Sequence, residues 1–235
     1  PTSHANRWAN DTWTNPTIWE DIAAGTFDLY YDRLFRRIAR RCAQTYRSPR
    51  TVVILPAVEC NHRDVLHAVG PYVSDFLAAW QKIVTLAHTA AEAILGTGNK
   101  FKIGFLPSQH LFFGTGSVRL SDLYPGDDYV DHLGLIVRDY WGVANPAGWA
   151  AILTYPVTLA GATAEGVHDW LDFCAGRAGK WLGLACRTNY VGTSAFPRTT
   201  DPESWWAGVD DLRRRYDGRL AWITHTWMAG FNEAP

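Results

Sequence analysis

Short apolar segments alternate with amphipathic segments along this chain, and no other feature limits its possible folds as strongly. Five of the apolar segments are rich in residues that favour β-strands, and they recur about every 30 to 50 residues. They lie near residues 51–58, 102–106, 129–137, 181–185 and 220–224. Spacing of this size leaves room for a helix between consecutive strands, as parallel strands require. The alternation therefore predicts an α/β protein with a parallel sheet.

The segments between these strands have helical character. Residues 28–44 and 72–95 repeat apolar residues at a period near 3.6, which is typical of helices with one buried face. Residues 164–178 predict a third helix. The Asp-Pro-Glu sequence at 201–203 predicts the start of a fourth, with Asp as the cap and Pro in the first turn. Residues 1–25 show no clear period, and we expect a long loop there.

Charge and hydropathy exclude several classes of function. The formal net charge of −1 gives no electrostatic basis for binding nucleic acid. The arginines clustered at 36–41 and at 213–215 fall in helical segments, where we expect solvent-exposed helix faces. No apolar run reaches the roughly 18 residues of a membrane span. The histidines lack metal-ligand spacing, and the Gly-rich residues 114–117 lack the lysine of a phosphate-binding loop. We expect neither a metal nor another cofactor.

Tryptophan is unusually abundant, with twelve residues in a chain of 235. Indole rings offer flat apolar faces with one polar group, which suits stacking against sugar rings. A large aromatic core uses many rings as well, so the composition leaves both roles open.

A set of short motifs narrows the choice of family. They are Trp19–Asp28, Glu59-Cys60-Asn61, the segment Phe76–Val84 around Trp80, Tyr124–Asp131, Gly134, and Gly179-Lys180. In order and spacing these resemble glycoside hydrolase family 26, which contains β-mannanases and related β-glycanases. The resemblance implies a (β/α)₈ barrel of the TIM type, of which this chain carries about five βα units, strands four to eight. We therefore interpret residues 1–235 as a single domain.

The resemblance also implies that barrel units are missing from this chain. Five βα units cannot close a barrel, and an open parallel edge leaves strand hydrogen-bonding groups unpaired. The sequence begins with Pro1, and its only methionine is Met228. We expect the chain to be a segment of a longer polypeptide or assembly. The remaining units would come from the same polypeptide or from another chain, unless the barrel is half open.

The same resemblance assigns catalytic positions. Glu59 matches the position of the acid/base, at the end of a strand, and Asn61 after it is expected either to hydrogen-bond a sugar hydroxyl or to hold Glu59. The nucleophile of the family is a Glu six residues after the lysine that matches Lys180, and here that position is Cys186. Retaining hydrolysis needs two carboxylates about 5 Å apart. The nucleophilic carboxylate is therefore absent, and we interpret Cys186 as an inactive replacement.

Other residues near the strand ends complete the candidate site. Asp139 is the candidate substitute partner of Glu59, in an inverting reaction with the two carboxyl groups about 6.5 to 9.5 Å apart. Tyr140 is expected to line the cleft, and His62 to join the polar network beside Asn61. The last strand and its exit supply three further candidates for substrate contact, Trp222, His225 and Trp227. Because strand residues alternate between faces, Trp222 and Trp227 cannot both point inward.

Two functions remain. One is a glycoside-hydrolase-like domain that binds or processes a β-glycan or mannan-type polysaccharide, either active through Glu59 or a pseudoenzyme. The other is a structural or adhesin module of a larger assembly, such as a phage tail, without turnover. Both place the protein outside the cell or on a virion surface.

Overall fold

Five parallel strands form the central sheet of this computed structural model, which describes residues 17–45, 52–57, 73–107, 120–138, 158–159, 162–163, 167–189 and 202–228. The strands are β1 (Val53–Ile54), β2 (Lys102–Phe105), β3 (His132–Arg138), β6 (Trp181–Asn189) and β7 (Leu220–Met228). Their order in the sheet, β1-β2-β3-β6-β7, is their order in the chain. The predicted α/β class and parallel sheet are confirmed.

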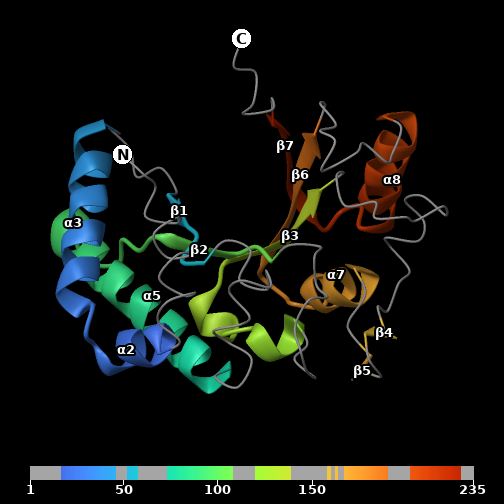
Figure 1. The fold of residues 1–235 in the computed structure, drawn as a ribbon. Coiled ribbons are helices and arrows are strands. Elements are labelled where there is room, and N and C mark those ends of the chain that lie inside the picture. The colour runs from blue at the N-terminus through green and yellow to red at the C-terminus, as the bar shows by residue number, and fades with distance from the viewer. Residues whose placement is uncertain are drawn as a thin grey trace, which may run out of the picture.

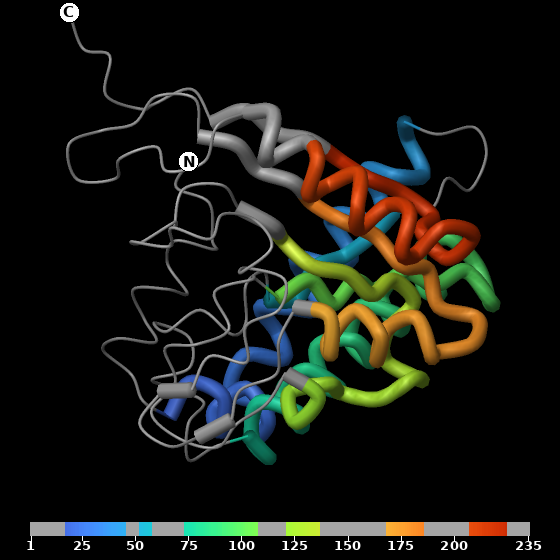
Figure 2. The backbone as a smooth tube through the Cα atoms, turned by 90° about the vertical axis from the view of Figure 1, so that its right-hand side faces the viewer, coloured from blue at the N-terminus to red at the C-terminus, as the bar shows by residue number. Residues whose placement is uncertain are grey.

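Helices lie on the convex side of the curved sheet (Figure 1). Two of them, α2 (Ile18–Ala24) and α3 (Asp28–Thr45), precede β1, and three connect strands: α5 (Val73–Leu95), α7 (Val167–Ala175) and α8 (Pro202–Arg215). The 3-10 turns η1 (Leu120–Leu123) and η2 (Asp127–Tyr129) lie between β2 and β3 in the chain. A small antiparallel pair, β4 (Thr158–Leu159) and β5 (Ala162–Thr163), lies between β3 and α7 in the chain. Figure 2 shows α7 and α8 next to each other, where the Tyr216 hydroxyl donates to Asp172 over 2.8 Å.

The four predicted helices are confirmed, but the loop expected over residues 1–25 is wrong for α2. This helix has only about two turns, too few to show a clear period. It forms because Ile18, Trp19 and Ile22 are buried, and the Trp19 ring meets the Phe76 ring of α5 edge-on at 4.9 Å. Gly25 ends it in the left-handed conformation, with φ of 97°.

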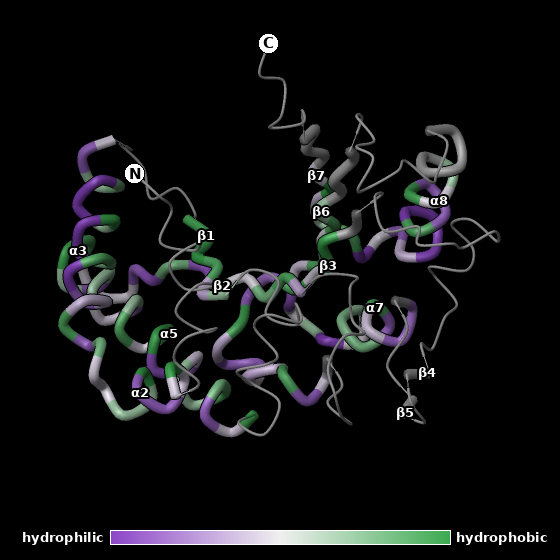
Figure 3. The backbone as a smooth tube through the Cα atoms, viewed as in Figure 1, coloured by the Kyte–Doolittle hydropathy of each residue, from purple (hydrophilic) through white to green (hydrophobic). Residues whose placement is uncertain are grey.

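Alternation along the strands divides their residues into two sets. The helix-facing set is apolar and is covered by the aromatic residues of α5 and α7; its members include Ile103, Phe105, Leu133, Leu135, Leu182 and Leu184, none more than 1% exposed. The opposite set, which we call the inner set, includes Gly104, Gly134 and Gly183. Figure 3 shows hydrophobic residues in the described parts of β1, β3 and α5, and hydrophilic residues alternating with hydrophobic ones along α3. The described part of each strand therefore has one face in the core and one facing the concave side.

Two tryptophans fix the helices to the sheet. The Trp80 ring packs edge-on against Phe105 at 5.2 Å, and the Trp170 ring lies 5.6 Å from the same phenyl ring. Both indole N–H groups are satisfied: Trp80 donates to the carbonyl of Tyr129, and Trp170 donates to the carbonyl of Gly134 over 2.9 Å. Burial of these large rings supplies much of the hydrophobic stabilisation while leaving no unpaired indole donor.

The inner set contains glycines because neighbouring groups occupy the space of a side chain. A Cβ on Gly134 would lie 2.3 Å from the carbonyl oxygen of Gly183, its register partner. A Cβ on Gly183 would lie 2.0 Å from the indole of Trp222. Leu55 would similarly meet a Cβ on Gly104 at 2.5 Å. The sheet thus depends on glycine at these inner positions.

The motif at residues 124–131 builds the amino-terminal end of the sheet. The Tyr124 hydroxyl donates to Asp127 over 2.7 Å, and the guanidinium of Arg177 lies over the Tyr124 ring at 5.4 Å and the Phe173 ring at 4.2 Å. Burial, reinforced by Asp127, raises the pKa of Tyr124. The turn η2 occupies residues predicted to start a strand at 129, so β3 begins at His132 instead.

Asp131 joins the first residues of three strands. Its carboxylate accepts a hydrogen bond from the Ile103 N–H over 2.9 Å and pairs with the Lys102 ammonium at 2.8 Å. Its carbonyl accepts from the Trp181 N–H over 3.0 Å. Burial alone would raise the pKa of Asp131, but the hydrogen bonds from Lys102 and Ile103, with the charges of Lys102 and Lys180, hold it below its ordinary value.

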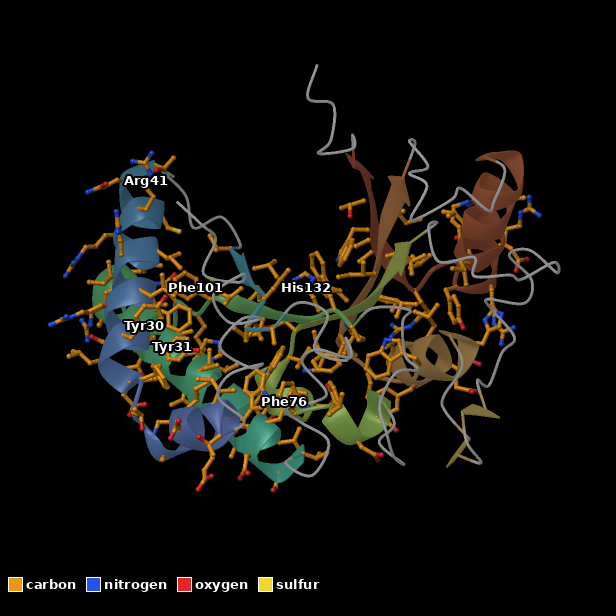
Figure 4. The ribbon with its side chains drawn as sticks, in the orientation of Figure 1. Tyr30, Tyr31, Arg41, Phe76, Phe101 and His132 are labelled. Atoms are coloured by element: carbon orange, nitrogen blue, oxygen red, sulfur yellow. The ribbon has the colours of Figure 1, made fainter. Side chains whose placement is uncertain are left out.

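On α3, Tyr31, Phe35 and Ala39 are buried, and the Tyr31 and Phe35 rings stack at 5.8 Å. Tyr31 lies on the side of α3 that faces α5, and Phe101 lies next to that side (Figure 4). Arg41 lies at the exposed end of α3. The predicted solvent-exposed arginine faces are confirmed for Arg41 and for residues 213–215. Over the described ranges, no helix is both long and apolar enough to cross a membrane.

The glycine requirement is testable at Gly183. We expect Gly183→Ala to destabilise the protein by about 2 kcal/mol, because the added methyl group overlaps the Trp222 indole in a packed sheet. The free energy of unfolding in urea measures this. Gly176→Ala is the matched control, since its Cβ would make only ordinary 3.5 Å contacts. An equal effect of both substitutions would contradict the packing argument.

Asp131 gives a prediction that depends on pH. At pH 7 we expect Asp131→Asn to lose about 1 kcal/mol of stability, because it removes charge-assisted hydrogen bonds. The folded pKa is depressed, so this stabilisation is present above the unfolded value of about 3.9 and is lost as pH falls through the folded pKa. Urea unfolding from pH 7 to pH 3 should show the stability difference between the two proteins shrinking as the pH falls below about 4. The exposed Asp128→Asn is the control; a difference that stays constant from pH 7 to pH 3 would refute the assignment.

Candidate functional site

The carboxyl ends of β3, β6 and β7 meet at one edge of the sheet, where parallel α/β proteins carry their binding residues. The register continues to this edge: Val137 pairs with Cys186 and Cys186 with His225, and Arg138 pairs with Arg187 and Arg187 with Thr226. Residues far apart in the chain are therefore neighbours in two rows across the three strands. These rows define the described part of the candidate site.

Cys186 lies in the carboxyl-terminal half of β6, where its register partners are Val137 of β3 and His225 of β7. Earlier in β6, Leu182 and Leu184 are buried under the helices, and Gly183 between them belongs to the inner set. The Cys186 side chain lies outside what the structure describes, so its assignment to the nucleophile position stays a prediction from the motifs.

Trp222 is on the inner face, but near the amino-terminal end of its strand. Its half-buried indole lies against Gly183. Met228, the last residue of β7, comes six positions after Trp222. At the rise of a strand, the two residues are about 20 Å apart. His225 and Trp227 lie nearer the carboxyl end of β7, three and five residues after Trp222. Substrate contact by these three residues stays a prediction, and packing on Gly183 is the contact that Trp222 makes.

The remaining candidates lie outside the described residues. These are Glu59, Asn61 and His62, which follow β1 in the chain, and Asp139 and Tyr140, which directly follow Arg138 of β3. Their assignment still rests on the motifs. Among the described residues, no three His, Cys, Asp or Glu side chains come together as a metal site would require.

The register reveals two residues that sequence reasoning missed. Arg138 and Arg187 are direct register partners near the carboxyl ends of β3 and β6. None of the five strands of this sheet contains an Asp or Glu over its described range. The sequence does contain one signal for this pairing. Arg138 comes four residues after Gly134, and Arg187 comes four residues after Gly183.

The amino-terminal end of the inner face carries a buried histidine beside an exposed tryptophan. His132 is buried at 7% exposure and its ring lies 5.1 Å from that of Trp181, which is 59% exposed. Burial lowers the pKa of His132, although the nearby Asp131 carboxylate partly opposes this. The ring is therefore neutral at pH 7. Figure 4 shows His132 near the middle of the sheet. This pair lies at the end where barrel residues serve stability.

Comparison with known proteins identifies the fold. No protein-family model matches the sequence, and no curated protein matches it. Several solved structures are similar, among them the following two. GH26C from Muricauda sp. MAR_2010_75 has a TM-score of 0.60 and 18% identity, over 90% of this chain and 52% of that one. The catalytic domain of the GH26 endo-β-1,4-mannanase from Bacillus sp. JAMB-750 has a TM-score of 0.53 and 18% identity, over 86% and 48%.

At 18% identity these similarities show the fold, and they extend over only part of each solved structure. The chain spans about half the length of both structures. The GH26-like fold expected from the motifs is thus confirmed for the parallel sheet and its helices.

Proposed function

We propose that this chain is part of a glycoside-hydrolase-like domain that binds a β-linked polysaccharide at the carboxyl ends of its strands. The observation that carries the proposal is the likeness to two GH26 structures over most of the chain, one of them an endo-β-1,4-mannanase. The predicted acid/base Glu59 follows a strand of this sheet, which is the position that chemistry in a barrel requires.

We expect this domain to bind polysaccharide without hydrolysing it. A retaining reaction needs a nucleophilic carboxylate about 5 Å from the acid/base. Cys186 stands at the nucleophile position, and the five strands contain no carboxylate over their described ranges. A second acid would have to come from a connecting segment, and Asp139 is the candidate. The alternative function, a structural module of an extracellular or virion assembly, is equally compatible with an absence of hydrolysis.

The proposal includes further barrel units, from the same polypeptide or from another chain. Parallel sheets are covered on both faces in stable proteins. Here, three inner-face residues remain substantially exposed: Val53 at 42%, Leu55 at 37% and Trp181 at 59%. On the other side of β7, Ile223 is 40% exposed. Further strands over the concave side and a helix over Ile223 would bury these side chains.

Native gels containing polysaccharide test the proposed function. We expect the protein to be retarded by at least one polymer in a panel of β-mannan, β-glucan, xylan and their uronate-bearing counterparts. We expect no release of reducing ends, because the nucleophile is absent. An unrelated protein of similar size is the control for retardation.

Glu59→Gln decides between binding and hydrolysis. Release of reducing ends that Glu59→Gln abolishes would contradict the loss of turnover, and Asp139→Asn would then test the second carboxylate. The matched control is Glu20→Gln, an exposed position on α2, which should change nothing. If the protein neither binds nor cleaves any polymer, the structural alternative stands.

A further inference from the structure

One side of helix α3 carries a row of exposed arginines. They are Arg33, Arg37, Arg40 and Arg41, and we call them the α3 arginine row. Their spacing in the sequence places them within about 100° of the helix circumference and over about 12 Å of its length. Tyr31, Phe35 and Ala39 are buried on the other side of the helix, so the row faces solvent. Figure 4 shows Arg41 at the exposed end of α3.

The row differs from the other arginines whose side chains the structure describes. Those all have a polar partner, which is an aspartate for Arg36, Arg177, Arg213, Arg214 and Arg215 and a pair of backbone carbonyls for Arg219. The two acids of α3, Asp28 and Asp32, pair with Lys82 and Arg36. Among the described residues, no carboxylate pairs with any member of the α3 arginine row. The positive charge of this surface is therefore available to an external anion.

Repulsion within the row disfavours the helix that carries it. Arg33 and Arg37 are four residues apart, as are Arg37 and Arg41, and like charges at this spacing destabilise a helix. The formal net charge of the whole chain is −1, so the row does not reflect a general excess of basic residues. An anion bound along the row would remove the repulsion, and positive charge concentrated on one helix attracts such a ligand.

The side chains around the row indicate which kind of anion fits. A protein partner needs an apolar patch at the centre of its interface, and Leu29 is the only large apolar side chain that α3 exposes over its described length. Single-stranded nucleic acid needs exposed aromatic rings for base stacking, and the aromatic residues of α3 are buried or half-buried. A polymer with a carboxylate on each sugar needs only a series of cations, and guanidinium groups match carboxylates in planar pairs of hydrogen bonds.

We propose that the α3 arginine row binds an acidic polysaccharide whose sugars carry carboxylates. This surface goes beyond the proposed function, which places binding at the carboxyl ends of the strands. Helix α3 precedes β1 and lies on the convex side of the sheet. The row recognises charge, so a neutral polysaccharide gains nothing from it.

Affinity gel electrophoresis of the full 235-residue chain in poly-β-mannuronate tests the proposal. The same polymer after chemical reduction of its carboxyl groups shares backbone and linkage and lacks the charge. The double substitution Arg37→Gln and Arg41→Gln should weaken binding of polymannuronate about tenfold at 50 mM salt and leave binding of the reduced polymer unchanged. Raising the salt concentration to 500 mM should weaken binding of the acidic polymer and reduce the difference between the two proteins.

The matched control removes the same charge from another exposed helix. Arg213 and Arg214 of α8 both pair with Asp210, and Arg213→Gln with Arg214→Gln should bind polymannuronate like the unmodified protein. Arg37→Lys with Arg41→Lys keeps the charge and should retain most of the affinity. Thermal unfolding followed by circular dichroism checks the fold. The α3 glutamine variant should melt no earlier than the unmodified protein, because repulsion within the helix is removed.

Four results would overturn the acidic-polysaccharide surface. They are no binding of polymannuronate at 50 mM salt, undiminished binding by the α3 glutamine variant, equal weakening in the α8 control, and tighter binding of duplex DNA at the same concentration of negative charge with the same loss in the α3 variant. The third result would mean that net charge alone sets the affinity, and the fourth would assign the row to nucleic acid. None of them affects the proposed function, because binding of neutral polysaccharide at the strand ends does not involve α3.

Discussion

The close approach of β3 and β6 at Gly134 and Gly183 is the constraint on which the rest of this structure depends. A side chain at Gly134 would run into the backbone of β6, and one at Gly183 would run into the indole of Trp222. The space above these glycines is taken by larger side chains from the flanking strands, Leu106 and Trp222. This arrangement leaves Leu133, Leu135, Leu182 and Leu184 to face the helices, where the tryptophans of α5 and α7 cover the sheet.

The contacts that the structure describes in most detail lie at the amino-terminal end of the sheet. There, Asp131 joins β2, β3 and β6 through backbone and side-chain hydrogen bonds, and the cluster of Tyr124, Asp127 and Arg177 supports it. The motif-predicted Glu59 and Asp139 follow β1 and β3 in the chain, at the carboxyl ends of these strands. Residues 124–131 therefore serve the scaffold, and a resemblance in this segment predicts the fold better than it predicts activity.

The sequence predicted the strands and long helices because their signals are local. A strand buried on both faces is a continuous apolar run, and a helix of 18 residues repeats its period several times. The two-turn helix α2 and the 3-10 turn before β3 are too short for such a signal. The arginine pair depends on the alignment of β3 with β6, which is set by contacts across 49 residues of sequence and is not contained in either strand alone. Glu59, Asn61, His62, Asp139 and Tyr140 remain predictions from motifs.

The strand order has a consequence for how such a domain assembles. Because β1, β2, β3, β6 and β7 lie in the sheet in the order of synthesis, each strand that leaves the ribosome finds its pairing partner already made. Among the described strands, none pairs between two strands that precede it in the chain. A unit added or removed at either edge changes one pairing only, so a sheet of this kind is well suited to growth and exchange in whole βα steps during evolution.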